Sequence, residues 1–371
     1  ANSSGGSAPS KQAAGMSFNL TKFVSQGAFQ VGYALYKTRL GQTFHQRICA
    51  ESREGGPHSK GATVPIVPGA HVTVVPILGD NYCYLIVDEA TKTCLAVDPS
   101  DAEEVLRAVD SEGLTLSGVL TTHAHWDHSG GNEEIRQRCP DVKIYGTKKD
   151  QVPGMTDAVV EGDMFWFPSH SVSKTPNLVL QVWETPCHTR GHVIFVLCSK
   201  PAEGEGDQPV PVAVFTGDTL FSGGTGKFFE GTAREMHDNL TRIAGLPSSA
   251  KVFCGHEYTL TNYKYAAALE PDNLSVQQRV ESALKLRQDR MPTVPTTIAE
   301  ELATNPYMRV ATSRAACGRI ATALCSITED AAFREGCADS VSVLAELRRV
   351  RDDNLAKAQM DAVGAGARAA A

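Results

Sequence analysis

The sequence predicts an α/β fold in which a strand-rich domain is flanked by helical segments at both ends. Short β-branched runs separated by turn residues recur between residues 61 and 258, as is typical of packed sheets. Beyond residue 258 the apolar residues recur at helical spacing and strand signals become scarce. Because 371 residues exceed one compact small domain, we expect three parts, residues 1–60, 61–258 and 259–371.

The first part is predicted to contain a tail, an amphipathic helix and a linker. Residues 1–15 are rich in Ser, Gly and Ala and are expected to be disordered. A helical pattern with one apolar face runs from Phe18 to about Ile48, and a linker follows from Glu51 to Thr63. Residues 1–50 contain Lys and Arg but no Asp or Glu, which indicates an organelle signal or a binding helix.

Residues 16–50 therefore have three candidate roles. A basic amphipathic helix can bind an anionic membrane surface, dock onto a larger assembly or pack on its own domain. The same charge pattern favours a mitochondrial location over a cytoplasmic one.

The strand-rich part is predicted to begin with an antiparallel meander. Its three strands are His71–Ile77, Tyr82–Val87 and Cys94–Val97. Helices are expected at Ala102–Glu112, with Asp101 as a candidate cap, and at Asn132–Arg138. The later predicted strands are Val142–Tyr145, Leu178–Trp183, Val193–Cys198, Val210–Phe215 and Val252–Phe253. In the last part, the predicted helices are Asn273–Arg290, Ile298–Thr304 and Val341–Lys357.

Composition excludes several classes of function. The chain is 42% hydrophobic and 21% charged, as soluble globular proteins are. Its net charge of −7 argues against nucleic acid as the main ligand. The ten cysteines form no CxxC pair or regular framework, so we expect them to be reduced. No apolar run reaches the length of a membrane span.

A cluster of metal-binding residue types follows the apolar run Gly118–Leu120. Its members are His123, His125, Asp127 and His128. Three later strands are each followed by a further candidate ligand, namely His188, Asp218 or His256. Imidazole and carboxylate together suit Zn²⁺, Fe²⁺ or Mn²⁺ rather than Ca²⁺ or Mg²⁺. Seven such groups are enough for two ions with one shared carboxylate.

The motifs HxHxDH, TPxHT, TGD and GHEY resemble those of the metallo-β-lactamase fold, a four-layer αββα sandwich. Within that fold they resemble the thioesterase branch, hydroxyacylglutathione hydrolase or glyoxalase II. The resemblance implies one ion at His123, His125 and His188, a second at Asp127, His128 and His256, and Asp218 between them. It also implies that Asp98 orients a ligand and that His192 is structural or supports a ligand.

The glyoxalase II resemblance further implies contacts with glutathione. Lys227, Arg348 and Arg351 would face its carboxylates, while Tyr258 and Asn262 would follow its backbone. A charged helix face in solvent is the alternative for the two arginines. The sequence departs from the family at Phe229, which replaces a substrate-contacting tyrosine, and at Thr225, Arg351 and Cys187. Cys187 stands for a glycine beside His188 and is either a packed thiol or a redox-sensitive gate.

Several segments narrow the resemblance to the PNKD-like hydrolases, relatives of glyoxalase II with an N-terminal extension. These segments include residues 35–44, 58–60, 79–82, 97–101 and 125–132. The family would make residues 61–258 the catalytic domain and residues 259–371 a helical substrate-binding domain and tail.

The expected activity is hydrolysis of a thioester, such as the glutathione conjugate S-lactoylglutathione. Two divalent ions, Zn²⁺ first with Fe²⁺ or Mn²⁺ as alternatives, would activate a bridging hydroxide without any side-chain nucleophile. Two other functions remain open on sequence alone. One is a mononuclear-iron persulfide dioxygenase, which shares much of the ligand set, and the other is a structural subunit that retains the hydrolase fold.

Overall fold

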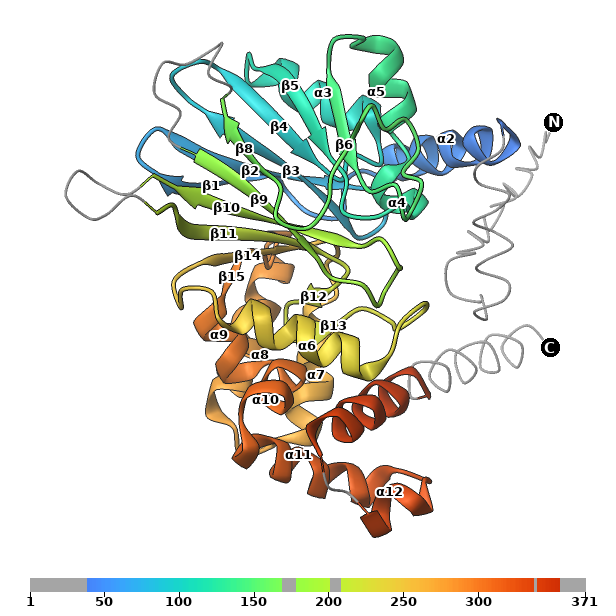
Figure 1. Cartoon of the computed structure of the whole chain (residues 1–371), viewed down its shortest axis with the longest axis vertical. Coiled ribbons are helices and arrows are strands. Elements are labelled where there is room, and N and C mark those ends of the chain that lie inside the picture. The colour runs from blue at the N-terminus through green and yellow to red at the C-terminus, as the bar shows by residue number, and fades with distance from the viewer. Residues whose placement is uncertain (1–38, 169–177, 201–207, 337–338, 354–371) are drawn as a thin grey trace, which may run out of the picture.

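The computed structural model describes residues 39–168, 178–200, 208–336 and 339–353. Two β-sheets are stacked face to face, and helices cover both outer faces (Figure 1). The predicted four-layer αββα sandwich with a C-terminal helical region is confirmed.

The first sheet has strand order β1-β2-β3-β4-β5-β6-β7. Its strands are β1 (Ala62–Val67), β2 (Ala70–Ile77), β3 (Asn81–Asp88), β4 (Thr93–Val97), β5 (Thr115–Leu120), β6 (Lys143–Gly146) and β7 (Asp157–Ala158). Strands β1 to β4 pair antiparallel, which confirms the predicted meander, whereas β4 to β7 pair parallel. Because β4 and β5 are parallel, their carboxyl ends meet at one edge of the sheet.

The second sheet has strand order β15-β14-β11-β10-β9-β8. Its strands are β8 (Met164–Phe167), β9 (Leu178–Glu184), β10 (Val193–Ser199), β11 (Val210–Gly217), β14 (Lys251–Cys254) and β15 (Thr296–Thr297). A separate short ribbon pairs β12 (Leu220–Phe221) with β13 (Gly224–Thr225). Strand β15 comes from the C-terminal helical region and pairs antiparallel with β14, so this region completes the sheet of the domain before it.

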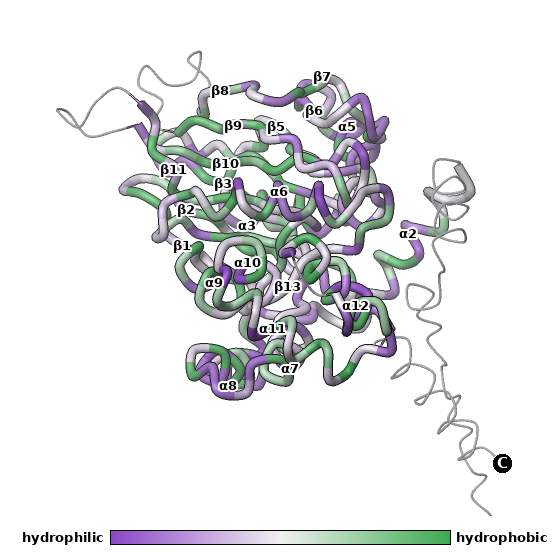
Figure 2. Tube along the Cα trace, turned by 60° about the horizontal axis from the view of Figure 1, so that its bottom comes forward, coloured by the Kyte–Doolittle hydropathy of each residue, from purple (hydrophilic) through white to green (hydrophobic). Residues whose placement is uncertain are grey.

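The core between the sheets follows from the alternation of side chains along each strand. In β10, Val193, Phe195 and Leu197 face the first sheet, while Ile194 and Val196 face the helices on the other side. Both faces of such a strand are covered, which explains why its sequence is continuously apolar. Figure 2 shows green, hydrophobic residues running along β9, β10 and β11.

Helices α3 (Ala102–Ser111) and α5 (Asn132–Arg138) cover the outer face of the first sheet. The α3 helix begins as predicted, because the Asp101 side chain accepts a hydrogen bond from the Glu104 backbone. On the second sheet, α6 (Ala233–Ala244) and the C-terminal helices form the fourth layer. Those helices are α7 (Thr259–Leu269), α8 (Leu274–Gln288), α9 (Ile298–Thr304), α10 (Pro306–Thr312), α11 (Arg314–Ile327), α12 (Ala331–Gly336) and residues 340–353.

The N-terminal helix differs from its predicted bounds. Helix α2 (Arg39–Glu54) continues past Ile48 and includes the first residues of the predicted linker. Only its end can be compared, since residues 1–38 lie outside the described residues. The rest of the linker is ordered by contacts with α8, because the Arg287 guanidinium donates to the His58 carbonyl at 2.7 Å. No helix among the described residues is long and apolar enough to cross a membrane.

Candidate metal centre

Four strands deliver the candidate ligands to one edge of the sandwich. Strand β5 ends at Leu120 and is followed by His123, His125 and the short helix α4 (Trp126–Ser129), which carries Asp127 and His128. Strands β9, β11 and β14 run in the same direction and are followed by His188, Asp218 and His256 respectively. Parallel strands of one sheet end at the same edge, and the stacking of the two sheets places the end of β5 next to the ends of β9, β11 and β14.

Three imidazoles form the first group of ligands. His125 Nδ1 lies 2.9 Å from His123 Nε2 and 3.0 Å from His188 Nε2. All three side chains are buried. The three nitrogens are close enough to bind a single ion.

Asp127, His128 and His256 form the second group. His256 Nε2 lies 3.3 Å from His128 Nε2 and 3.4 Å from Asp127 Oδ2. Asn81 fixes the loop beneath them, since its side-chain amide donates to the Asp127 carbonyl at 2.9 Å. The two groups therefore present three ligand atoms each.

Asp218 lies between the two groups and offers one oxygen to each. Its Oδ2 is 3.4 Å from His188 Nε2, while its Oδ1 is 3.2 Å from His128 Nε2 and 3.5 Å from His256 Nε2. Although Oδ1 is buried, it accepts no hydrogen bond from any residue that the structure describes. A carboxylate with this orientation can bridge two cations.

The ring nitrogens that face away from the centre are fixed by hydrogen bonds. His128 Nδ1 donates to Asp98 Oδ2 and His256 Nδ1 donates to Asp80 Oδ1, both at 2.9 Å. His188 Nδ1 donates to the Lys227 carbonyl at 2.9 Å. These bonds leave the Nε2 lone pairs free to bind a cation, as is usual for histidines that bind metal. The predicted orienting role of Asp98 matches this geometry.

The electrostatics divide the histidines into two sets. Burial and the neighbouring imidazoles hold the pKa of His123 and His125 well below the usual range, and burial lowers the pKa of His188. Burial also opposes protonation of His128 and His256, but nearby carboxylates, chiefly Asp218, outweigh it. The pKa of His128 is therefore raised well above normal, and that of His256 is raised to about 10. The carboxylates around His128 and His256 thus favour positive charge in the second group of ligands.

The donor set fits divalent cations. His123 and His188 donate their Nδ1 protons elsewhere, so both of their Nε2 lone pairs face His125 Nδ1. One proton on His125 cannot satisfy two lone pairs, whereas a cation bound by all three can. The unsatisfied Asp218 oxygen in the neighbouring group has the same explanation.

Sequence reasoning did not identify two acidic residues that support the centre. Asp80 orients His256 from a turn that is far away in the chain. Asp150 accepts hydrogen bonds from the Ala124 and Gly191 backbones and from the Thr189 hydroxyl, so it ties two ligand loops together. Asp80 lies in residues 79–82, one of the segments that carry the family resemblance, but that segment indicated no role for it, and Asp150 is a lone acid in a turn. His192, in contrast, supports Asp218 by accepting its backbone N–H at 3.1 Å.

Three of the predicted substrate residues lie close to the metal centre. The Phe229 ring packs edge-on against His188, with centroids 5.1 Å apart, and the Lys227 ammonium lies 5.9 Å from the Phe229 centroid. Lys227 is exposed, with 47% of its side chain accessible. On the other side of the centre, Tyr258 stacks on His256 at 4.6 Å and remains partly exposed.

The other three predicted substrate residues already bind one another or the backbone. The Arg351 guanidinium donates to Asn262 Oδ1 at 3.2 Å, and Asn262 donates to the Ser222 carbonyl at 3.1 Å; both side chains are buried. Arg348 donates to the Thr225 carbonyl at 2.8 Å and pairs with Asp352. The alternative of a fully solvated arginine face is wrong, because these two side chains are largely buried.

Cys187 is a packed thiol. It is fully buried in the core that α6 completes, and its sulfur lies 3.4 Å from the Thr232 carbonyl. Burial raises the pKa of the thiol to about 12, so it stays protonated. A side chain that packs in the core does not narrow the metal centre. The geometry therefore disfavours a redox-sensitive gate at Cys187.

The fold and the centre define a class. The family model described as the metallo-beta-lactamase superfamily matches residues 77–256, and the model for the hydroxyacylglutathione hydrolase C-terminus matches residues 257–354. The catalytic part of the chain is thus a metallo-β-lactamase domain, followed by the helical region that one of its hydrolase branches carries.

Relatives identify the branch. The chain is 47% identical over 237 residues to the cytoplasmic hydroxyacylglutathione hydrolase of Arabidopsis thaliana, covering 64% of this chain and 86% of that one. It is 40% identical over 240 residues to the hydroxyacylglutathione hydrolase-like protein of Gallus gallus, covering 64% and 80%. The chain belongs to the hydroxyacylglutathione hydrolase family and is a hydrolase.

A solved metallo-beta-lactamase from Staphylococcus aureus subsp. aureus COL also resembles the chain. The two share 22% identity and a TM-score of 0.46, over 71% of this chain and 69% of that structure. Membership in a hydrolase family favours hydrolysis over the persulfide dioxygenase and the structural subunit.

Proposed function

We propose that the protein hydrolyses a glutathione thioester with the help of two divalent ions. His123, His125 and His188 would hold the first ion, and Asp127, His128 and His256 the second. The observation that carries this proposal is the position of Asp218, which offers one oxygen to each group of ligands. A site for a single ion gives no reason for a second complete group at this distance.

The ligand types restrict the metal. Imidazole and carboxylate donors suit Zn²⁺, Fe²⁺ or Mn²⁺, and zinc is the first choice because it accepts both types without a preferred geometry. A pair of such ions polarises a carbonyl and lowers the pKa of a bound water to about 7. The protein contributes neutral imidazoles at the first group, fixed ring orientations, and a buried carboxylate whose pKa is held well below normal by His256 and His128 against the effect of burial.

The leaving group explains why no side-chain acid is needed. A thiolate departs readily because the pKa of an ordinary thiol is only about 8.5. Tyr258 is the phenol stacked on His256, and burial holds the pKa of its hydroxyl well above the usual range. It can donate a hydrogen bond to a substrate at the rim of the centre without losing its proton.

Glutathione is the proposed thiol because a cation and aromatic rings border the centre. Lys227 is an exposed cation beside Phe229, in a chain whose net charge is −7. A tripeptide with two carboxylates complements such a lysine, and the relatives' names specify hydroxyacylglutathione as their substrate. S-lactoylglutathione is therefore the substrate to test first.

Metal analysis combined with an S-lactoylglutathione assay tests the proposal. We expect two ions per chain, release of the thiol and a carboxylic acid, and loss of both activity and metal after treatment with a chelator. Restoring Zn²⁺, Fe²⁺ or Mn²⁺ separately should show which ion supports turnover. Turnover that persists with one ion per chain would contradict the two-ion site, and two ions without thioester hydrolysis would contradict the substrate.

Replacing Lys227 with alanine is expected to raise KM about three- to tenfold and leave kcat nearly unchanged, since the lysine would bind the unreacting tripeptide in ground and transition states alike. Lys143→Ala is the matched control, because both lysines are exposed and paired with an aspartate, Lys227 with Asp352 and Lys143 with Asp157 on the first sheet. Steady-state kinetics on S-lactoylglutathione measure both. If Lys227→Ala keeps the wild-type KM, the lysine does not bind the substrate.

The burial of Arg351 predicts a different result for Arg351→Ala than for Lys227→Ala. Because Arg351 binds Asn262 inside the protein, its removal leaves a buried amide oxygen without that partner. We expect a lower melting temperature for Arg351→Ala, which Lys227→Ala should not show. A melting temperature equal to that of the wild type would show that Arg351 has no structural role.

A further inference from the structure

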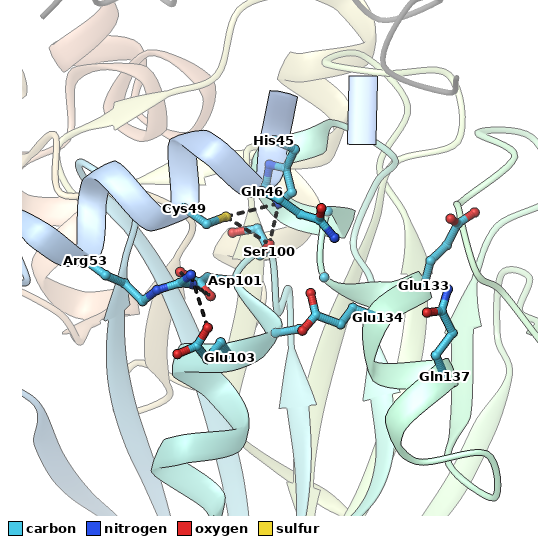
Figure 3. A pocket seen from close by; sticks show the side chains of 13 residues that line it. His45, Gln46, Cys49, Arg53, Ser100, Asp101, Glu103, Glu133, Glu134 and Gln137 are labelled. Carbon is cyan, nitrogen blue, oxygen red and sulfur yellow. Dashed lines mark hydrogen bonds and ion pairs between the residues drawn. The ribbon is translucent and has the colours of Figure 1, made fainter. Parts of the chain in front are cut away.

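Helix α2 lies outside both regions that match the family models, residues 77–256 and 257–354, yet it packs against the catalytic domain. Figure 3 shows its inner face above the loop that follows β4 and the start of α5. The described part of the predicted docking segment, residues 39–50, thus contacts the chain's own domain. This arrangement is the third of the roles expected for residues 16–50.

His45 is a buried residue of this helix that contacts the catalytic domain. Its side chain is only 4% exposed, and Nε2 donates to the Ser100 carbonyl at 2.6 Å. The same ring packs edge-on against Trp126, with centroids 5.5 Å apart. It also fits over Gly130, where an added Cβ would lie 2.2 Å from His45 Nε2. Only a glycine leaves room for the imidazole at this place.

The two residues that His45 contacts, Ser100 and Trp126, are each linked to His128. The Ser100 backbone donates to the Asp98 carbonyl at 3.0 Å, and the Asp98 carboxylate accepts from His128 Nδ1 at 2.9 Å. Trp126 is the first residue of α4, the short helix that contains His128. His45 therefore holds the carboxylate loop and the ligand helix against each other.

Other residues of α2 hold the helix against the start of α3. Arg53 forms ion pairs with Asp101 at 2.6 Å and with Glu103 at 3.2 Å. Cys49 Sγ lies 3.4 Å from His45 Nε2, one helical turn along. These contacts fix the helix at the start of α3, so the position of the His45 ring is determined from both sides.

We infer that His45 is a positioning residue for the second ion, and that α2 is an added support of that half of the metal centre. The inference rests on the proposed two-ion site. His45 acts by holding the Asp98 carboxylate, which accepts directly from His128, and the ligand helix at their mutual distance, whereas Asp98 is linked to His123 of the first group indirectly, through the Thr122 hydroxyl.

Titration of Zn²⁺ into the metal-free full chain tests this role in His45→Ala. Loss of a direct partner of a metal ligand typically weakens binding 10- to 100-fold, and His45 lies one residue further from the ligand, so we expect the second ion to bind about three- to tenfold more weakly. The first ion should bind as in the wild type. Arg47→Ala is the matched control, since Arg47 is an exposed neighbour on the same helix and should change neither affinity. Absorption of the Co²⁺-loaded protein should show loss of the second-site bands only.

His45→Gln supplies the confirming variant, because its amide N–H can occupy the position of Nε2 and should restore much of the affinity for the second ion. Equal affinity of both ions in His45→Ala and the wild type would overturn the inference, as would an equal loss at both sites or no recovery in His45→Gln. If the wild-type chain itself binds only one ion, the two-ion proposal fails and this inference fails with it. Two ions in the wild type and unchanged binding in His45→Ala would overturn the role of His45 alone.

Discussion

Asp218→Asn is expected to lower kcat/KM by at least about a thousandfold, which corresponds to about 4 kcal/mol of transition-state stabilisation. The substitution keeps the shape of the side chain but replaces one charged oxygen with an N–H donor. That oxygen would serve either the His188 side or the His128 side of the centre. No other described carboxylate reaches both groups, so nothing nearby can substitute for it.

Metal stoichiometry separates this effect from a general loss of folding. We expect Asp218→Asn to bind one ion or fewer, whereas Asp127→Asn should lose the second ion only, since Asp127 lies near His128 and His256. Asp238→Asn is the control, because Asp238 is 64% exposed on α6, away from the ligands. Two tightly bound ions in Asp218→Asn would show that this carboxylate is not the bridge.

The sequence predicted the metal centre more fully than its surroundings for a topological reason. Each candidate ligand follows an apolar strand, and the carboxyl ends of parallel strands must share an edge. Four candidate ligands lie within the six positions from His123 to His128, so the sequence alone predicts a shared site. The expectation needed only local pattern and strand direction.

Supporting residues could not be found in this way, because their partners are distant in sequence. Asp80 reaches His256 across 176 positions, and the segment 79–82 that contains it predicts a turn without indicating this partner. The packing partner of helix α2 could not be predicted from the sequence either. Its amphipathic pattern indicated that one face would be covered, but it did not specify whether a membrane, a partner or the chain itself would cover it.

Burial also decides between roles that charge alone leaves open. Arg348 and Arg351 were expected to reach the substrate, yet Arg351 lies inside the protein against Asn262. Likewise, the sequence left Cys187 as either a packed thiol or a redox-sensitive gate, and the structure places its side chain in the core. Which face of an element packs against the rest of the protein depends on tertiary contacts, and single residues at such faces are the least predictable from sequence.

Asp150→Asn is expected to weaken binding of the first ion about 10- to 100-fold, the range typical for partners that orient metal ligands. Asp150 Oδ1 accepts the Gly191 N–H at 2.5 Å, while Oδ2 accepts from the Thr189 hydroxyl at 2.5 Å and from the Ala124 N–H at 3.3 Å. Ala124 lies between two ligands, and Thr189 follows His188 directly. The carboxylate thus sets the distance between the two loops that supply the first group.

An asparagine of the same size cannot make these contacts. Its NH₂ group would face either the Gly191 N–H or the donors on the other side, and two donors cannot satisfy each other. The Gly191 backbone is packed directly against this carboxylate, since a Cβ added at Gly191 would lie 2.5 Å from Asp150 Oδ1. The ligand loops should therefore move apart, and His188 should lose its alignment with His123 and His125.

Zn²⁺ titration and melting temperatures of the metal-free proteins distinguish alignment from stability. An amide has only one of the two acceptor oxygens that the Gly191, Thr189 and Ala124 donors use, so a buried donor loses its partner even in the metal-free protein. We expect a somewhat lower metal-free melting temperature and, at a temperature where the protein is still folded, weaker binding of the first ion than of the second. Asp141→Asn, a change at an exposed acid before β6, should alter neither quantity. Wild-type affinity for both ions in Asp150→Asn would show that the loops hold their distance without this carboxylate.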